Sequence, residues 1–361
     1  MKKHLLITVV LLMSFSFAHG QSKYSNEFLS LGIGARGLAM GNTMCAISDD
    51  VTAAYWNPAG LGRMDKKYQL SLMHAEYFAG VAKYDYAGIG YKIDDRSSVA
   101  LSYIRFGVDN IMNTTELIDA QGNVDYDRIS YFSASDNAFL LSYAYNFEKV
   151  PGLSLGANAK IIYRNIGKFA NAWGFGLDFG LQYNHKGWQA GAMLRDGTST
   201  FNAWNYHLTD QVIDIFHQTG NEIPENELEL TLPALMLGAG KYVELGKGFN
   251  ATFALGLDCT FDGKRNTLIK SNVLSMDPHF GMEFAYKKIV ALRAGIGNFQ
   301  QEPDFDGKKK TTLQINLGVG VCIKNIVSID YAFTDLGDIS IAQYSHIISL
   351  KVAIDRFKKQ Q

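Results

Sequence analysis

Three glycines near the N-terminus, Gly32, Gly34 and Gly37, have the spacing G-x-G-x-x-G that can bind the pyrophosphate of a dinucleotide. In that role the glycines form a tight turn after a buried strand, and a helix that begins there points its N-terminus at the phosphates. The residues before Gly32 read SKYSNEFLSL, which is too polar and too short for such a strand. We therefore expect no nucleotide or other cofactor, and we interpret the glycines as residues that permit tight backbone turns.

The other residues that could do chemistry lack a catalytic or metal-binding arrangement. His185 lies in a short predicted turn and His207 and His217 in a loop, and none has the spacing of a metal-ligand pair. The nucleophile motif G-x-S-x-G does not occur, and Ser, His and Asp follow one another in no recognisable catalytic order. The sequence therefore predicts a protein that is not an enzyme and holds no metal.

The first twenty residues have the pattern of a cleaved secretory signal peptide. Lys2 and Lys3 precede an apolar run from Leu5 to Ala18, and a small-x-small site follows at Ala18 to Gly20. The run is too short for a membrane-spanning helix. We expect residues 1–20 to be removed and the mature chain to leave the cytoplasm, where a nicotinamide cofactor would be found.

Composition narrows the class of protein. The net charge of −1 gives no sign of nucleic-acid binding, and charged residues make up 19% of the chain, below the roughly 25% of soluble domains. Three cysteines allow at most one disulfide. No apolar run of about 18 residues follows the signal peptide, so a membrane-bound form of this chain would have to span the bilayer with strands.

Hydrophobicity alternates with a period of two along most of the chain. In the stretch FNATFALGLDCTF, which begins at Phe249, one set of alternate positions is large and apolar and the other is small or polar. The same pattern recurs in AWGFGLDFGLQY, which begins at Ala172, and in TLQINLGVGV, which begins at Thr312. Alternation over about ten residues is typical of a strand that has one face toward lipid and the other toward a hydrated lumen.

The pattern predicts an all-β fold: a transmembrane antiparallel β-barrel of about 14 strands. The barrel is expected to occupy residues 68–357, with both termini in the periplasm, because short turns alternate with long loops. The strands are predicted at residues 68–75, 81–93, 97–108, 137–148, 153–165, 171–184, 187–195, 230–243, 249–262, 278–286, 289–299, 311–323, 326–334 and 345–356.

Residues 21–67 do not alternate and are rich in Gly, Ala and Met. Such small residues allow a segment to fold compactly inside a barrel. We therefore predict that residues 21–67 form an N-terminal plug, or hatch, in the lumen. The predicted plug motif consists of Gly32, Gly34, Arg36, Gly37, Trp56, Asn57, Pro58, Ala59 and Gly60.

Charged residues at inward positions suggest how the plug is held. The alternation places Lys160, Asp178, Asp258, Asp330 and Lys351 in the lumen. One interpretation is that they are solvated charges of a pore. The other is that Arg36 pairs with a lumenal carboxylate, Asp178 or Asp258, and latches the plug, because such a partly buried pair is costly to break from one side.

Two stretches of the plug resemble a known family. GIGARGLAMGN and AISDDVTAAYWNPAGL resemble the N-terminal part of the PorV/PorQ family of Bacteroidota outer-membrane proteins, which is itself similar to the fatty-acid channel FadL. Asn57, Pro58 and Ala59 match an Asn-Pro-Ala element of the FadL hatch. The resemblance implies a FadL-like barrel with an N-terminal hatch, and a non-enzymatic role as a subunit or shuttle in type IX protein secretion at the outer membrane.

Two alternatives to secretion remain open. The chain could be a FadL-type channel for hydrophobic small molecules, or an accessory subunit of another outer-membrane complex for barrel insertion or nutrient uptake. The expected partners are outer-membrane lipids and other outer-membrane or secretion-system proteins, and no nucleic acid. A transporter should have an apolar lumen from its mouth to the plug, whereas a partner-binding barrel should expose apolar loop surface.

The longest predicted loop, from Asn202 to Pro233, contains a candidate partner-binding helix. Its apolar residues recur at helical spacing, with Thr209 or Asp210 able to start the helix and Gly220 to end it. The apolar face would pack on the barrel rim or bind a partner protein. The residues of this face are Leu208, Val212, Ile215 and Phe216.

Overall fold

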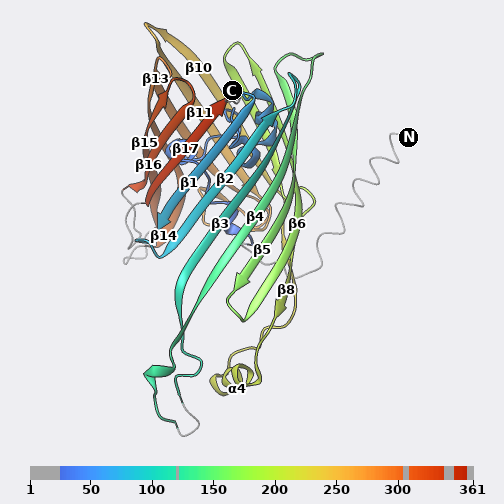
Figure 1. The fold of residues 1–361 in the computed structure, drawn as a ribbon, viewed down its shortest axis with the longest axis vertical. Helices are drawn as coiled ribbons and strands as arrows, with labels where there is room; N and C mark the ends of the chain where they lie inside the picture. The colour runs from blue at the N-terminus through green and yellow to red at the C-terminus, as the bar shows by residue number, and fades with distance from the viewer. Residues whose placement is uncertain (1–24, 119–121, 304–308, 337–344, 356–361) are drawn as a thin grey trace, which may run out of the picture.

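A closed antiparallel β-barrel is the main feature of the computed structural model, which describes residues 25–118, 122–303, 309–336 and 345–355 (Figure 1). All described strands belong to one sheet of 17 strands. The first strand, β1 (Tyr68–Tyr77), pairs with the last, β17 (Ser345–Ile354), and this pairing closes the barrel with Tyr68 opposite Ile354. The predicted fold class is therefore confirmed.

Fourteen of the strands form the wall, and three short ones extend it. The wall strands are β1, β2 (Ala82–Lys92), β3 (Ser97–Asn113), β4 (Ser130–Asn146), β5 (Leu153–Ile166), β6 (Ala170–His185), β7 (Trp188–Arg195), β10 (Ala234–Gly246), β11 (Phe249–Thr260), β13 (Ser275–Tyr286), β14 (Val290–Pro303), β15 (Lys309–Ile323), β16 (Val327–Leu336) and β17. Each overlaps one predicted strand. The short strands are β8 (Thr200–Tyr206), β9 (Leu228–Thr231) and β12 (Ile269–Lys270). The sequence did not predict β8 and β12, and the predicted strand 230–243 begins within β9.

The alternating sequence pattern sets which face of each strand is apolar. On β6, the outward side chains of Trp173, Phe175 and Phe179 are 58%, 42% and 45% exposed, and the inward residues between them are small or polar. This outward apolar face is the one that lipid covers in an outer-membrane barrel. In the described part of the chain, no helix is long and apolar enough to cross a bilayer.

The connections differ between the two ends of the barrel. At one end, which we call the short-turn end, tight turns join β2 to β3, β4 to β5 and β6 to β7, and β1 begins there beside the end of β17. At the other, the long-loop end, β3 and β4 and the loop that carries α4 (Asp210–Thr219) project well beyond the other strands (Figure 1). The predicted helix is present as α4, capped by Thr209 and ended by Gly220 with a φ of 68°.

The wall is interrupted between β7 and β8. Strand β6 pairs with β7 as far as Phe179 opposite Leu194, and it resumes with β8 at Phe175 opposite Phe201. The residues between, Asp196 to Ser199, bulge out of the ladder, and Asp196 has a φ of 54°. The sequence Asp-Gly-Thr-Ser reads as a loop, so the continuation of the strand as β8 was missed.

The segment before β1 lies inside the barrel, and we call residues 25–67 the plug segment (Figure 1). It consists of short helical turns, η1 (Glu27–Leu29), α2 (Ala35–Ala39), α3 (Ala53–Trp56) and η2 (Pro58–Arg63). Gly32 and Gly34 have φ values of 92° and 75°, which residues with a Cβ rarely adopt. Gly37 lies against the indole of Trp56, where a Cβ would come within 2.6 Å. The glycine motif thus shapes the turns of this segment.

Candidate functional site

The Asn57-Pro58-Ala59 element holds the plug segment against the barrel wall. The side-chain amide of Asn57 donates to the carbonyl oxygens of Cys45 at 2.9 Å and Leu181 at 3.0 Å. Its own oxygen accepts from the backbone N–H of Ala59 at 3.2 Å. Gly156 lets the two backbones meet, because a Cβ there would come within 2.3 Å of the Ala59 nitrogen. This element therefore fixes the plug segment to β6 through a fully buried side chain.

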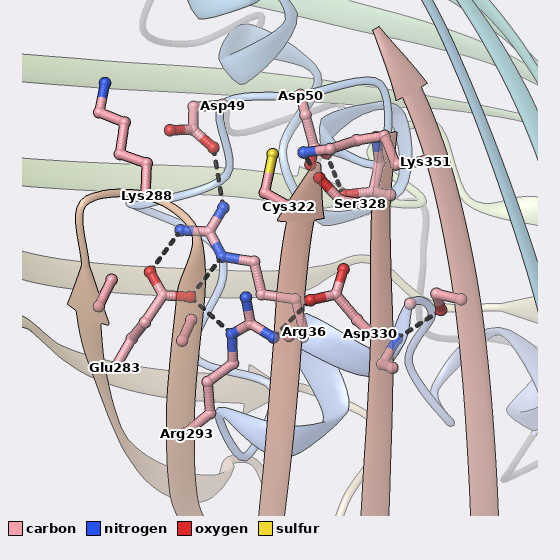
Figure 2. A pocket seen from close by; sticks show the side chains of 18 of the residues that line it. Arg36, Asp49, Asp50, Glu283, Lys288, Arg293, Cys322, Ser328, Asp330 and Lys351 are labelled. Atoms are coloured by element: carbon pink, nitrogen blue, oxygen red, sulfur yellow. Dashed lines mark hydrogen bonds and ion pairs between the residues drawn. The ribbon is translucent and has the colours of Figure 1, made fainter. Parts of the chain in front are cut away.

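A chain of ion pairs joins the plug segment to the opposite wall (Figure 2). Arg36 on α2 contacts Glu283 on β13 through two hydrogen bonds, of 3.0 and 3.1 Å, and also pairs with Asp49 at 2.9 Å. Glu283 in turn pairs with Arg293 on β14 at 2.6 Å, and Arg293 with Asp330 on β16 at 2.6 Å. We call Arg36, Glu283, Arg293 and Asp330 the latch. A bidentate guanidinium–carboxylate pair fixes orientation as well as position.

The latch makes the expected plug–barrel ion pair, but with a different carboxylate. Arg36 pairs with Glu283, whereas Asp178 pairs with Lys160 and Asp258 lies beside His279. Glu283 was missed because it sits in the stretch HFGMEFAYKK, where alternation alone does not show which charge faces the plug. The signal that could have found it is the pair of opposite charges Glu283 and Arg293, which lie directly across from each other on β13 and β14.

A second ion pair ties the plug segment to β17. Lys351 donates to Asp50 at 2.7 Å, and the other Asp50 oxygen accepts from Thr52. Burial opposes ionisation of Asp50, but Lys351 and Arg36 outweigh it and hold the pKa of this carboxyl well below its usual range. Stability from a lowered carboxyl pKa is present above the unfolded value of about 3.9 and is lost only as pH falls through the folded value. We therefore expect this pair to stay ionised at neutral pH.

The latch lines a polar cavity of about 390 Å³ at the short-turn end. Figure 2 shows Arg36 pointing toward Glu283 and Asp49, and Lys351 toward Asp50, along one side of this cavity. The turn residues Lys288 and Asn325 also line it, which places the cavity between the plug segment and the short turns. Its walls carry both signs of charge, so it suits water and ions better than an apolar molecule.

Three charged side chains are buried behind the interruption of the wall. Lys160 on β5 pairs with Asp178 at 2.9 Å and with Asp196 at 2.5 Å. These side chains are only 2%, 2% and 7% exposed. Asp178 also accepts from the backbone N–H of Asp196 at 2.8 Å. The predicted lumenal charges Lys160 and Asp178 are thus paired and shielded from water, and they hold the bulge that follows β7.

Two of the other three predicted lumenal charges are in ion pairs, and the third lies beside a histidine. Asp330 and Lys351 belong to the ion pairs described above, and Asp258 lies 3.4 Å from the imidazole of His279. In the described residues, no group of three or more His, Cys, Asp or Glu side chains is arranged to hold a metal ion. The charges of the lumen therefore connect the plug segment to strands and strands to one another.

One sector of the lumen wall, on β2, β3 and β5, is apolar, and the ion pair of Arg164 with Asp136 borders it toward the long-loop end. Tyr84, Ile104 and Ile162 are inward-facing and 0% exposed, and they form one cluster with the plug residues Phe28, Leu29 and Ile33. Tyr84 donates its hydroxyl to the Phe28 carbonyl at 2.9 Å. Tyr77 and Phe106 continue this wall outward as aromatic neighbours of Tyr84, at centroid distances of 6.2 and 6.1 Å. We call Tyr77, Tyr84, Ile104, Phe106 and Ile162 the apolar wall.

The predicted partner-binding residues lie outside the lumen, on and next to α4. Val212 is buried, Ile215 and Phe216 are half-buried, and Leu208 precedes the helix. The apolar face of α4 is thus only partly covered by the chain itself.

Comparisons with known proteins come from structure alone, since no family model and no curated protein matches this chain. Similar folds include the CymD monoaromatic hydrocarbon channel, with a TM-score of 0.56, 13% identity and coverage of 90% of this chain and 98% of that one. The toluene transporter TbuX of Ralstonia pickettii has a TM-score of 0.55 and 14% identity, with coverage of 90% of this chain and 98% of that one. The toluene transporter TodX of Pseudomonas putida has a TM-score of 0.55 and 13% identity, with coverage of 89% of this chain and 97% of that one. At these identities the likeness shows the fold, that of an outer-membrane barrel, and these neighbours are channels or transporters.

Proposed function

We propose that this protein is a FadL-type outer-membrane channel for hydrophobic small molecules. The observation that carries the proposal is the apolar wall, which lines one sector of the lumen with tyrosine, phenylalanine and isoleucine where a porin has a polar, water-filled interior. Apolar and aromatic side chains stabilise an apolar solute through the same burial that stabilises a protein core. The fold likeness to hydrocarbon and toluene channels supports the same assignment.

The plug segment divides the lumen into two parts with different roles. At the long-loop end, Phe28 and Leu29 pack on the apolar wall and occupy the path that an apolar molecule would take. At the short-turn end, the latch surrounds the polar cavity. In our proposal the solute displaces the N-terminal part of the plug segment, Ser25 to Ile33, while the latch stays in place and keeps ions and polar solutes from crossing.

A role as a non-enzymatic subunit in protein secretion is the second candidate. Its support is the resemblance of the plug motif to the PorV/PorQ family, together with the partly covered apolar face of α4. The channel is favoured over it because the apolar wall is a property of the lumen itself, which a shuttle for protein cargo does not need.

Changing the apolar wall should change uptake of an apolar solute. Phe106→Glu places a second carboxylate directly opposite Asp136 and beside Tyr84, so we expect uptake of radiolabelled toluene by cells that express the variant to fall by about tenfold. Phe106→Leu keeps the site apolar and is the matched control, with uptake within about twofold of the wild type. Equal uptake by both variants at equal folded amounts would contradict a route along this wall.

We further propose that both termini and the short turns face the periplasm, as the arrangement of turns and loops favours. Single cysteines at Asn123, in the β3–β4 loop, and at Lys247, in the β10–β11 turn, should then differ in intact cells. An impermeant maleimide should label the first position and spare the second until the outer membrane is opened. Labelling of Lys247→Cys alone in intact cells would contradict this proposal and indicate the opposite orientation.

A further inference from the structure

The hairpin of β3 and β4 continues beyond the barrel as a two-stranded ribbon. Strand β3 pairs with β2 as far as Val108, and β4 pairs with β5 as far as Ala134. Between themselves, β3 and β4 pair on to Asn113 opposite Ser130. In the described part of the chain, residues 111–113 and 130–132 therefore find ladder partners only in each other. Isolated two-stranded ribbons are marginally stable in water, and open strand edges readily bind another chain.

The tip of this ribbon exposes apolar and aromatic side chains outside the lipid-facing wall. Met112 lies directly opposite Tyr131, and Ile118 opposite Val124. These four side chains are 64%, 63%, 64% and 53% exposed, and Tyr126 beside them is 73% exposed. The neighbouring strands do not cover them, because the ribbon stands beyond the ends of those strands (Figure 1). Such a cluster of exposed apolar side chains is typical of a protein-binding surface.

The charge around this surface is strongly acidic and defines what it can bind. Residues 109–136 contain six acidic residues and one arginine, and residues 207–229, which include α4, contain six acidic residues and no lysine or arginine. These two segments carry a formal charge of −11 in a chain whose net charge is −1. Asp109, Asp136 and Glu229 are paired with Lys83 and Arg164 of the barrel strands, and the other nine acidic residues together with Arg128 give −8. Both segments project from the same end of the barrel (Figure 1). The single arginine, Arg128, is already paired with Asp125 at 3.1 Å.

We propose that the ribbon tip is a docking site for a partner protein whose binding face carries lysines and arginines around an apolar or aromatic centre. Glu116 and Asp127, beside the Asp125–Arg128 pair, supply the acidic rim, and Ile118, Val124 and Tyr126 the apolar centre. An acidic rim of this kind attracts a basic partner and repels anionic surfaces, so it selects against the phosphates of lipopolysaccharide. This function is separate from the channel, because no residue of the apolar wall takes part in it.

A synthetic peptide in which lysine alternates with leucine or tryptophan can probe the site on the full protein in nanodiscs of zwitterionic lipid. We expect it to bind, and Glu116→Gln/Asp125→Asn/Asp127→Asn to weaken binding by at least about tenfold. Ile118→Ser/Val124→Ser/Tyr126→Ser should weaken it similarly. The matched control, Asp95→Asn/Glu148→Gln/Glu244→Gln, removes three exposed carboxylates at the short-turn end and should leave binding unchanged.

Two further measurements, a change of salt concentration and a change of peptide, test the charge and the apolar contribution to binding separately. Raising the salt from about 0.1 M to about 1 M shortens the screening length from about 10 Å to about 3 Å, so binding should weaken steeply. A peptide with glutamate in place of lysine should not bind, and one with serine in place of its apolar residues should bind at least about tenfold more weakly. Equal losses in the control variant, or binding of the glutamate peptide, would overturn the proposal.

The natural occupant can be identified by a photo-crosslinking residue in place of Tyr126 in intact cells. We expect a crosslinked protein with a basic docking face, and its loss when Glu116, Asp125 and Asp127 are neutralised. Capture of lipopolysaccharide instead, or of a protein whose crosslink survives that neutralisation, would contradict the assignment.

Discussion

Replacing Lys160 by methionine should lower the free energy of unfolding by about 3–5 kcal/mol, which is the usual cost of leaving buried charges without their partner. The substitution leaves Asp178 and Asp196 side by side, at 2% and 7% side-chain exposure, with no cation between them. Because Asp196 begins the bulge between β7 and β8, we expect the wall to loosen there first. Urea unfolding followed by tryptophan fluorescence, together with heat-modifiable migration on gels, measures the effect.

Two control variants separate charge from packing at this site. Lys160→Met/Asp178→Asn/Asp196→Asn removes all three charges and keeps the side-chain carbonyls as acceptors, so it should recover most of the lost stability. Lys83→Met breaks the pair with Asp109, whose side chains are 43% and 35% exposed, and should cost less than about 1 kcal/mol. If the triple variant is no more stable than Lys160→Met, the loss comes from packing, and the role assigned to the buried charges is wrong.

Reversing Arg36 to glutamate should open the short-turn end to polar solutes. The new carboxylate faces Glu283 and Asp49, so two attractive contacts of 3.0 and 2.9 Å become repulsive. We expect the influx of the hydrophilic β-lactam nitrocefin into intact cells to rise by about tenfold or more, because like charges at this distance repel by several kcal/mol.

The latch also predicts which residue compensates and which does not. Arg36→Glu combined with Glu283→Gln removes the repulsion across the plug–wall contact and should restore part of the barrier to nitrocefin. Lys67→Glu makes the same change of charge at an exposed position beside β1 and should leave the barrier intact. A double-mutant cycle of Arg36 and Glu283 without coupling would leave the latch unsupported.

The fold could be predicted from the sequence because alternate residues of a barrel strand face lipid and the lumen, and the residue types alternate accordingly. Stretches such as Phe249 to Phe261 show this directly, and all fourteen wall strands were placed by it. The helix α4 could also be predicted from local residue types, because Thr209 caps its start and Gly220 ends it. The bulge at Asp196 was missed because its stability comes from Lys160 and Asp178, which are distant in sequence, and local residue types do not report such contacts.

The candidate site was predicted only in part, for a physical reason. The special residues of the plug segment were visible, because Gly32 and Gly34 are needed for turns and Asn57 is polar in an apolar context. The partners of those residues could not be predicted. Alternation indicates that Glu283, Asp178 and Asp258 can face the lumen, but it does not give the position of each carboxylate along and around the barrel axis. Which carboxylate meets Arg36 depends on how the plug segment folds, and no periodicity encodes that.

We propose that the barrel admits apolar molecules while its plug segment excludes polar ones. The most direct test compares two solutes in the same cells, with the wild-type protein or an empty vector: the hydrophobic dye N-phenyl-1-naphthylamine and the hydrophilic nitrocefin. We expect expression of the wild-type protein to speed accumulation of the dye and to leave nitrocefin influx unchanged. Faster influx of nitrocefin together with the dye, or no change in the dye, would contradict it.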